Sequence, residues 1–170
     1  SKVDGANFRC QYLPNEDRLE FGSRRYILDP NTDPDEWIAI RAYKKAFEEY
    51  HDNFIPNVVY FSESMQQHTI KYENIPDTIG YDVYDLKRGE FYDWKAAKEA
   101  FENIGIPFIH VHFEKRANKV TTDDLMELIK QSPYRKEGDE GVVLKCYRKL
   151  NAFGRPLFAK YVDPIFKEQN

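Results

Sequence analysis

The sequence predicts an α+β fold in which mostly antiparallel sheets are flanked by a few helices. Two patterns favour this class: strand-like runs outnumber helix-like runs, and they do not alternate regularly with helices as parallel βαβ units would. The size of the chain is a third observation, because 170 residues with 41% hydrophobic content and 15% aromatic residues suffice for one substantial core. We therefore expect a single domain over residues 1–170.

The first elements are predicted to be a hairpin followed by a helix. Residues 6–13 alternate like a strand, PNEDR reads as a turn, and RLEFGSRRYIL supplies the return strand, so the hairpin covers residues 6–28. Residues 33–54 predict a helix, because a helix-starting aspartate precedes apolar residues at helical spacing. Those apolar residues are Trp37, Ile40, Tyr43, Ala46, Phe47 and Tyr50.

The remaining elements are strands interrupted by two helices with capping signals. An aspartate and a closing glycine bound the helix expected at residues 93–105, and TTDDLMELIKQS predicts a second capped helix at 121–132. The expected strands share apolar or alternating composition and lie at residues 57–65, 79–86, 107–114, 140–147 and 156–162.

Charge and cysteine content limit the possible functions. With 25 basic and 29 acidic residues the net charge is −4, so bulk attraction to nucleic acid is not predicted and any phosphate contact needs a local basic cluster. Cys10 and Cys146 are too few for a disulfide framework and lack metal-site spacing, which favours an intracellular, cytoplasmic or nuclear, location. A membrane span is not expected, because no run of about 18 apolar residues occurs.

Charged side chains interrupt or end several of the apolar strand runs. Such groups are costly to bury unless they are paired or face a solvated cleft. Each one alone is compatible with an edge position, but their joint occurrence indicates one polar pocket. The residues are Glu63, Asp82, Asp85, Glu140, Lys145 and Lys160.

An ordered set of short motifs resembles the covalent nucleotidyltransferases, the family of polynucleotide ligases and mRNA capping enzymes. KVDG at residues 2–5 resembles their lysine motif, and KVDGAN is more similar to that of RNA ligases. FGSRRYIL, VVYFSESM, HTIKYENIP with GYDVYDL, EGVVLK and AKYV resemble the motifs that follow, in order and over nearly the whole chain. The chain thus resembles the adenylation domain of an ATP-dependent RNA ligase, similar to phage ligases that seal nicks in duplex RNA.

The resemblance implies a three-step chemistry. Lys2 attacks the α-phosphate of ATP and becomes lysyl-AMP, AMP moves to an RNA 5′-phosphate, and an RNA 3′-hydroxyl displaces it. Lys145 and Lys160 would favour the uncharged, nucleophilic amine and offset charge on the triphosphate. Glu140 would hold a hydrated Mg²⁺ or Mn²⁺. The substrate would be a nicked duplex or broken RNA ends, as in RNA repair.

The resemblance also assigns residues that bind the nucleotide. Glu63 would contact the ribose, with metal contact as a second option, and Arg24 matches the family arginine, with Arg25 one residue away. Tyr84 would stack on adenine or else pack in the core. Asp4, with Gly5, would fix the turn beside the lysine.

Several positions have two interpretations of different kinds. Asn7 would position the RNA 3′-end or a nucleotide phosphate, or serve the hairpin, and His68 would hydrogen-bond structurally or take part in catalysis. His110 and His112 share a strand face but have no evident third metal ligand, so we expect them to be structural. YRKLNAFGR at residues 147–155 suits a phosphate backbone and a stacked base on Phe153, or is a surface loop.

Two departures from the family pattern leave alternatives open. In the last motif, Val162 stands where classical members carry a second lysine. The chain also begins at its first motif, and for this reason we expect further sequence upstream that includes a substrate-binding domain. Alternatives on the same fold are a DNA ligase and a GTP-dependent capping guanylyltransferase. A third alternative is a non-catalytic nucleotide- or RNA-binding module.

Overall fold

The computed structural model describes residues 1–66, 71–114, 120–152 and 156–164. The chain divides into two compact units. We call Gly5–His68 with Pro76–Phe108 the sheet unit, and Ser1–Asp4, Thr69–Ile75 and Ile109–Asn170 the terminal unit.

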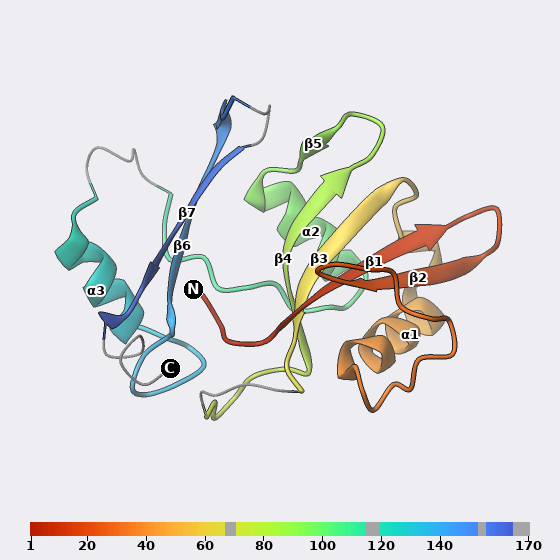
Figure 1. The fold of residues 1–170 in the computed structure, drawn as a ribbon, viewed down its shortest axis with the longest axis horizontal. Helices are drawn as coiled ribbons and strands as arrows, with labels where there is room; N and C mark the ends of the chain where they lie inside the picture. Colours follow the sequence, from red (N-terminus) through yellow and green to blue (C-terminus); the bar gives the residue numbers. More distant parts are fainter. Residues whose placement is uncertain (67–70, 115–119, 153–155, 165–170) are drawn as a thin grey trace. The chain divides into compact units, whose positions relative to one another are not determined.

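The sheet unit is built on an antiparallel sheet with the strand order β2-β1-β3-β4-β5 (Figure 1). This arrangement confirms the expected α+β class with antiparallel sheets. The strands are β1 (Ala6–Leu13), β2 (Arg18–Ser23), β3 (Val58–Ser64), β4 (Thr78–Asp85) and β5 (Glu90–Phe91). The short strand β5 was not predicted.

Two helices, α1 (Ile38–Tyr50) and α2 (Trp94–Asn103), pack on the same face of this sheet. Alternate residues of β1 and β3, such as Phe8 and Tyr60, point to that face and are fully buried. They meet Tyr43 of α1 and Phe101 of α2 in one aromatic-rich core. The sheet's other face therefore carries the intervening residues of the same strands.

The two helices of the sheet unit begin differently. The Asp93 side chain accepts hydrogen bonds from the backbone N–H groups of Lys95 and Ala96, both at 3.0 Å, and so caps α2 as predicted. The helix predicted from residue 33 instead begins at Ile38, without a side-chain cap. The Asp33 carboxylate is used in a local turn, where it accepts from the Asp35 N–H at 2.8 Å.

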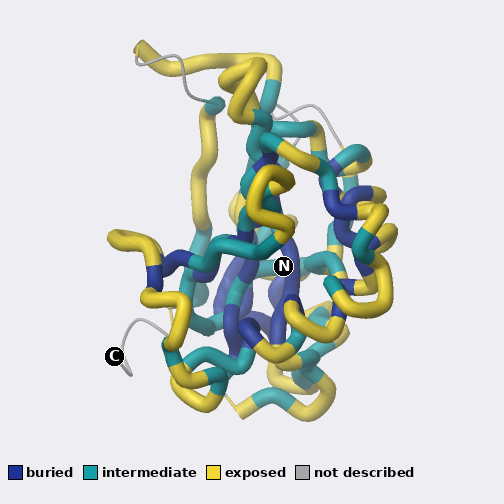
Figure 2. Tube along the Cα trace, turned by 90° about the vertical axis from the view of Figure 1, so that its right-hand side faces the viewer, coloured by how far each residue is buried: buried dark blue, intermediate teal, exposed yellow. Residues whose placement is uncertain are grey.

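The terminal unit contains a two-stranded antiparallel sheet of β6 (Gly141–Leu150) and β7 (Pro156–Val162) (Figure 1). It also contains α3 (Thr122–Lys130), whose start is fixed by the predicted cap: Thr121 and Asp124 form a reciprocal capping box. Burial is concentrated near the start of β6, while most of the outer half of the hairpin is exposed (Figure 2).

Two predicted strands are wrong in part. The return strand of the first hairpin ends at Ser23 rather than residue 28, because Ser23 N–H donates to the Tyr26 carbonyl at 2.9 Å and closes a turn. The strand predicted at residues 107–114 is not formed; an isolated bridge joins Phe108 to Gly80. The residues of PFIHVHFE alternate between apolar and polar as a strand would. Beyond that bridge, however, no strand among the described residues pairs with this segment.

No helix in the described part of the chain combines the length and apolar character needed to cross a membrane.

Candidate functional site

The opening lysine motif lies beside the start of β6 in the terminal unit. The Lys2 backbone N–H donates to the Gly141 carbonyl oxygen at 2.9 Å, which forms an isolated antiparallel bridge. The Lys2 ammonium group makes an ion pair and hydrogen bond with the Glu140 carboxylate. Only 22% of the Lys2 side chain and 10% of the Glu140 side chain are exposed, so the pair is largely shielded from solvent. Two predicted site residues 138 positions apart are therefore in direct contact.

A glycine after Glu140 allows this arrangement. Gly141 pairs with Val162 of β7 on one side and with Lys2 on the other. A Cβ atom at residue 141 would lie 2.2 Å from the Tyr161 carbonyl oxygen, far inside contact distance. The absent side chain thus lets backbone approach closely at the position that brings Lys2 to Glu140.

Asp4 and Tyr72 complete the surroundings of the lysine motif. The Asp4 backbone N–H donates to the Tyr72 hydroxyl oxygen at 2.6 Å. Burial raises the pKa of Tyr72, and the nearby carboxylates of Asp4 and Glu140 raise it further. The phenol is therefore neutral at physiological pH and contributes a polar, uncharged group. Sequence reasoning missed Tyr72, although it lies in the HTIKYENIP segment.

Lys145 and Lys160 lie on the same face of the β6–β7 hairpin. Lys145 is paired across the sheet with Phe158, and Lys160 with Val143. Directly opposed residues share a face, so the two lysines are diagonal neighbours, which lie about 7–8 Å apart, with a somewhat shorter separation between their Cβ atoms. Lys145 is half-buried, with its ammonium 5.5 Å from the centre of the Phe158 ring, and Lys160 is exposed. The hairpin thus presents both predicted cations together.

A second group of predicted residues lies in the sheet unit. Asn7 of β1 is paired with Glu63 of β3, and the Asn7 amide donates to the hydroxyl of Tyr81 on β4. These residues alternate with the buried Phe8 and Ser62, so they lie on the sheet face that α1 and α2 do not cover. Three neighbouring strands thus contribute polar groups to one face.

Opposite charges surround the Tyr81 hydroxyl. Burial raises the pKa of Tyr81, and the carboxylates of Glu63 and Asp82 raise it further. The positive charges of Arg24 and Arg9 act in the opposite direction. Arg24 itself is exposed, in the turn after β2. The structure therefore brings Arg24 and Glu63 into the neighbourhood of Asn7, through a tyrosine that sequence reasoning did not single out.

Tyr84 lies on the uncovered face rather than in the core. It is paired with Val59, which alternates with the buried Val58 and Tyr60. Its ring meets the edge of the Phe91 ring, with centroids 4.9 Å apart. The half-buried Tyr84 ring is therefore on the same side of the sheet as Glu63.

Gly5 of the lysine motif directly precedes β1. A Cβ atom at residue 5 would lie 2.7 Å from the Met65 sulfur, so a larger residue would not fit there without a shift.

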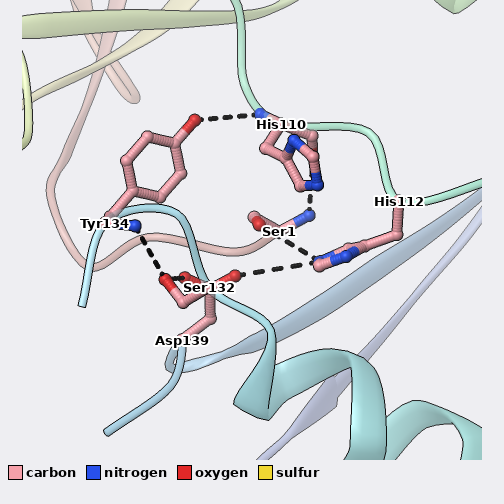
Figure 3. Close-up of polar contacts among 6 residues, drawn as sticks. All are labelled: Ser1, His110, His112, Ser132, Tyr134 and Asp139. Carbon is pink, nitrogen blue, oxygen red and sulfur yellow. Dashed lines mark hydrogen bonds and ion pairs between the residues drawn. The ribbon is translucent and has the colours of Figure 1, made fainter. Parts of the chain in front are cut away.

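His110 and His112, which were predicted to share a strand face, lie outside any strand and belong to a polar cluster in the terminal unit (Figure 3). The imidazole rings of His110 and His112 are 4.7 Å apart, and the His110 backbone N–H donates to the Tyr134 hydroxyl at 2.9 Å. Ser132 donates to the buried Asp139 carboxylate, which lies 3.9 Å from the His112 ring nitrogen. Burial lowers the pKa of His112 to about 4, so its ring is neutral.

The donor groups of the site determine which metal ions it could hold. Among the residues that the structure describes, no three side chains of His, Cys, Asp or Glu are gathered so as to hold a metal. Glu140 is a single carboxylate next to a lysine, which fits a Mg²⁺ ion that keeps most of its water ligands. His68, Phe153 and Arg155 lie outside the described residues.

Comparisons with known proteins place these observations in a family. The model of the RNA ligase family matches residues 1–162. No curated protein matches the chain significantly. Among solved structures, "Naegleria gruberi RNA ligase with PPi" is 17% identical with a TM-score of 0.66, and the match covers 99% of this chain and 50% of that chain.

Mutants of the same ligase give similar matches. One with ATP and Mn is 14% identical with a TM-score of 0.67, and one with AMP and Mn is 15% identical with a TM-score of 0.63. Each match covers 99% of this chain and 50% of the other. At these identities the likeness shows the fold, and the chain spans about half the length of the matched ligases.

Proposed function

Since this chain belongs to the RNA ligase family, we propose that it is the adenylation domain of an ATP-dependent RNA ligase. In this proposal it joins RNA 3′-hydroxyl and 5′-phosphate ends. The observation that carries the proposal is the contact between Lys2 and Glu140, because both occupy positions of the family's motifs and meet from distant parts of the chain.

The proposed reaction begins at the Lys2 amine. Its nitrogen attacks the α-phosphorus of ATP, the bond to the β-phosphate oxygen breaks, and pyrophosphate leaves as the amine loses a proton. The lysyl-AMP then passes its AMP to an RNA 5′-phosphate. Finally an RNA 3′-hydroxyl attacks that phosphate, a phosphodiester forms, and AMP leaves.

The residues of the terminal unit have complementary roles in the first step. While Lys2 is paired with Glu140 it is held as an ammonium ion, which is not nucleophilic. A divalent cation bound at Glu140 would neutralise that carboxylate and offset the charge of the phosphates. Lys145 and Lys160, on one face of the hairpin, supply positive charge for the triphosphate and the departing pyrophosphate.

The residues of the sheet unit are assigned to the nucleotide itself. Tyr84 offers a ring face to adenine, Glu63 accepts hydrogen bonds from the ribose, and Arg24 and Asn7 contact phosphate or the RNA end. The gathering of Tyr84, Glu63 and Asn7 on one sheet face supports these roles, and the charge of Arg24 acts on Tyr81 at that face from the turn after β2. The Naegleria ligase structures with ATP, AMP and Mn support the use of a nucleotide and a divalent metal.

The test is incubation of the chain with α-labelled ATP and Mg²⁺ or Mn²⁺. The wild-type chain should acquire a label that survives base and is released by acid. Lys2→Arg should acquire none, because a guanidinium keeps the positive charge opposite Glu140 yet is not nucleophilic. Lys130→Ala, which removes an exposed lysine of α3, is the matched control and should label normally.

Other outcomes separate the alternatives on the same fold. Labelling by GTP in preference to ATP would favour a capping guanylyltransferase. Better sealing of DNA nicks than of nicks with RNA at the 3′-side would favour a DNA ligase. ATP binding without any adduct would identify a non-catalytic module, which is the alternative that Val162 in the last motif supports.

A further inference from the structure

The β6–β7 hairpin has a charge opposite to that of the rest of the chain. Residues 141–162 contain five of the chain's 25 basic residues and none of its 29 acidic residues. The excess of acid therefore lies wholly outside this segment. A local basic segment of this kind can attract a polyanion even though the chain as a whole is acidic.

Aromatic and cationic side chains share one face of the hairpin. Cross-strand pairing puts Lys145 opposite Phe158 and Lys160 opposite Val143 on this face. The Tyr147 ring meets the Phe158 ring edge-on at 5.7 Å, which places Tyr147 on the same side. Phe158 is 40% exposed and Val143 is 38% exposed. We call these five residues the lysine face.

We propose that the lysine face is a docking surface for one RNA strand, with a base stacked on Phe158 and the adjoining phosphates held by Lys145 and Lys160. The identification of this strand as the ligase substrate rests on the proposed function. The charge, exposure and cross-strand register of the lysine face support the surface independently of that function. It adds an aromatic platform, Phe158 with Tyr147 at its edge, to the two lysines already assigned to phosphate chemistry.

The combination of groups fits a nucleic acid strand better than a protein or a membrane. Two lysines at diagonal positions on one face suit neighbouring phosphates, and an exposed ring suits the π-face of any base. The flexible Lys145 ammonium already lies over the Phe158 ring, so a cation and an aromatic surface are available at one point. The segment itself contributes no acidic side chain that would repel the phosphate backbone.

The test measures binding of a fluorescently labelled single-stranded RNA oligonucleotide to the chain over a series of KCl concentrations. Phe158→Leu keeps apolar bulk but removes the ring, and should weaken binding about tenfold with an unchanged salt dependence. Phe158→Trp should restore binding, because it returns an aromatic face. Lys160→Ala should reduce the magnitude of the slope of log K against log [KCl] by about 0.7, the contribution of one phosphate contact on a single strand.

Leu157→Ala is the matched control. Leu157 is the neighbour of Phe158 on β7, is 45% exposed, and is paired with Cys146 on the opposite face. It should bind RNA like the wild-type chain. Equal losses for Phe158→Leu and Leu157→Ala, or wild-type affinity for Phe158→Leu, would overturn the docking surface. So would binding to anionic lipid vesicles with no binding to RNA.

The outcome is separable from that of the proposed function. Labelling by ATP needs no RNA, and RNA binding needs no ATP. A chain that fails to take up AMP but binds RNA through Phe158 would contradict the ligase proposal and support the docking surface. A chain that takes up AMP at Lys2 but binds RNA independently of Phe158 would support the ligase proposal and overturn the docking surface.

Discussion

The hairpins β1–β2 and β6–β7 share an alternating pattern but use it differently. In β1, Phe8 and Cys10 are fully buried against α1 and the rest of the core. In β6, burial is confined to Gly141 and Val142, and the alternating side chains farther out are partly or fully exposed. Alternation therefore specifies a strand with two unlike faces, whereas a packed helix decides whether the apolar face becomes core.

The largest difference between the hairpins should appear in stability. Phe8→Ala removes a fully buried ring and should lower the free energy of unfolding by about 3–5 kcal/mol. Phe158→Ala removes an exposed ring and should lower it by no more than about 1 kcal/mol. Urea unfolding of both variants measures the contrast. Similar losses would mean that the outer hairpin contributes to a core after all.

A smaller contrast is expected between the glycines of the two hairpins. A Cβ at Gly141 meets the rigid Tyr161 carbonyl at 2.2 Å, so Gly141→Ala should cost about 1–3 kcal/mol of unfolding free energy. It should also reduce AMP uptake, because Lys2 is bridged to this residue. A Cβ at Gly22 first meets the end of the flexible Arg9 side chain at 3.0 Å. Gly22→Ala is therefore the matched variant. It should lower the free energy of unfolding by less than Gly141→Ala does, and it should leave AMP uptake unchanged.

The smallest effect concerns the tip of the first hairpin and depends on pH. The Asp17 carboxylate and His51 ring are 2.7 Å apart, and this hydrogen bond raises the pKa of His51 and lowers that of Asp17. Stabilisation by the pair is present between the ordinary pKa values of the two groups. It is lost as pH rises through the raised pKa of His51, and as pH falls through the lowered pKa of Asp17.

His51→Gln tests that dependence. The wild-type chain should exceed the variant in melting temperature at about pH 6, and the gap should shrink by about pH 9, where the imidazole is neutral. A gap of constant size would show that the contact contributes through hydrogen bonding alone. The exposed position of the pair keeps the expected difference small.

Much of the fold could be predicted because its signals are local. Asp93 and Thr121 cap their helices through bonds to residues two or three positions away, which a sequence reader can see. The strand predicted at 107–114 was wrong for the converse reason. Pairing depends on a neighbour elsewhere in the chain, and alternation in one segment carries no information about that neighbour.

The candidate site likewise contains residues that the sequence could indicate and residues that it could not. Lys2 and Glu140 were found because their motifs resemble those of a family, and no local pattern indicated that they touch. Tyr72, Tyr81 and Asp139 were not recognised as part of any cluster. A tyrosine or aspartate in an ordinary apolar or turn segment has no distinguishing neighbours in sequence, and its role depends on which distant charges surround it.

The ion pair at the start of the chain has a consequence for biosynthesis. Lys2 emerges from the ribosome 138 residues before its acidic partner. A nascent or truncated chain that ends before residue 140 carries the amine without the carboxylate that positions it. Under the proposed mechanism, translation therefore sets the earliest moment at which the protein can be charged with a nucleotide, and fragments released early would be inert rather than partly active.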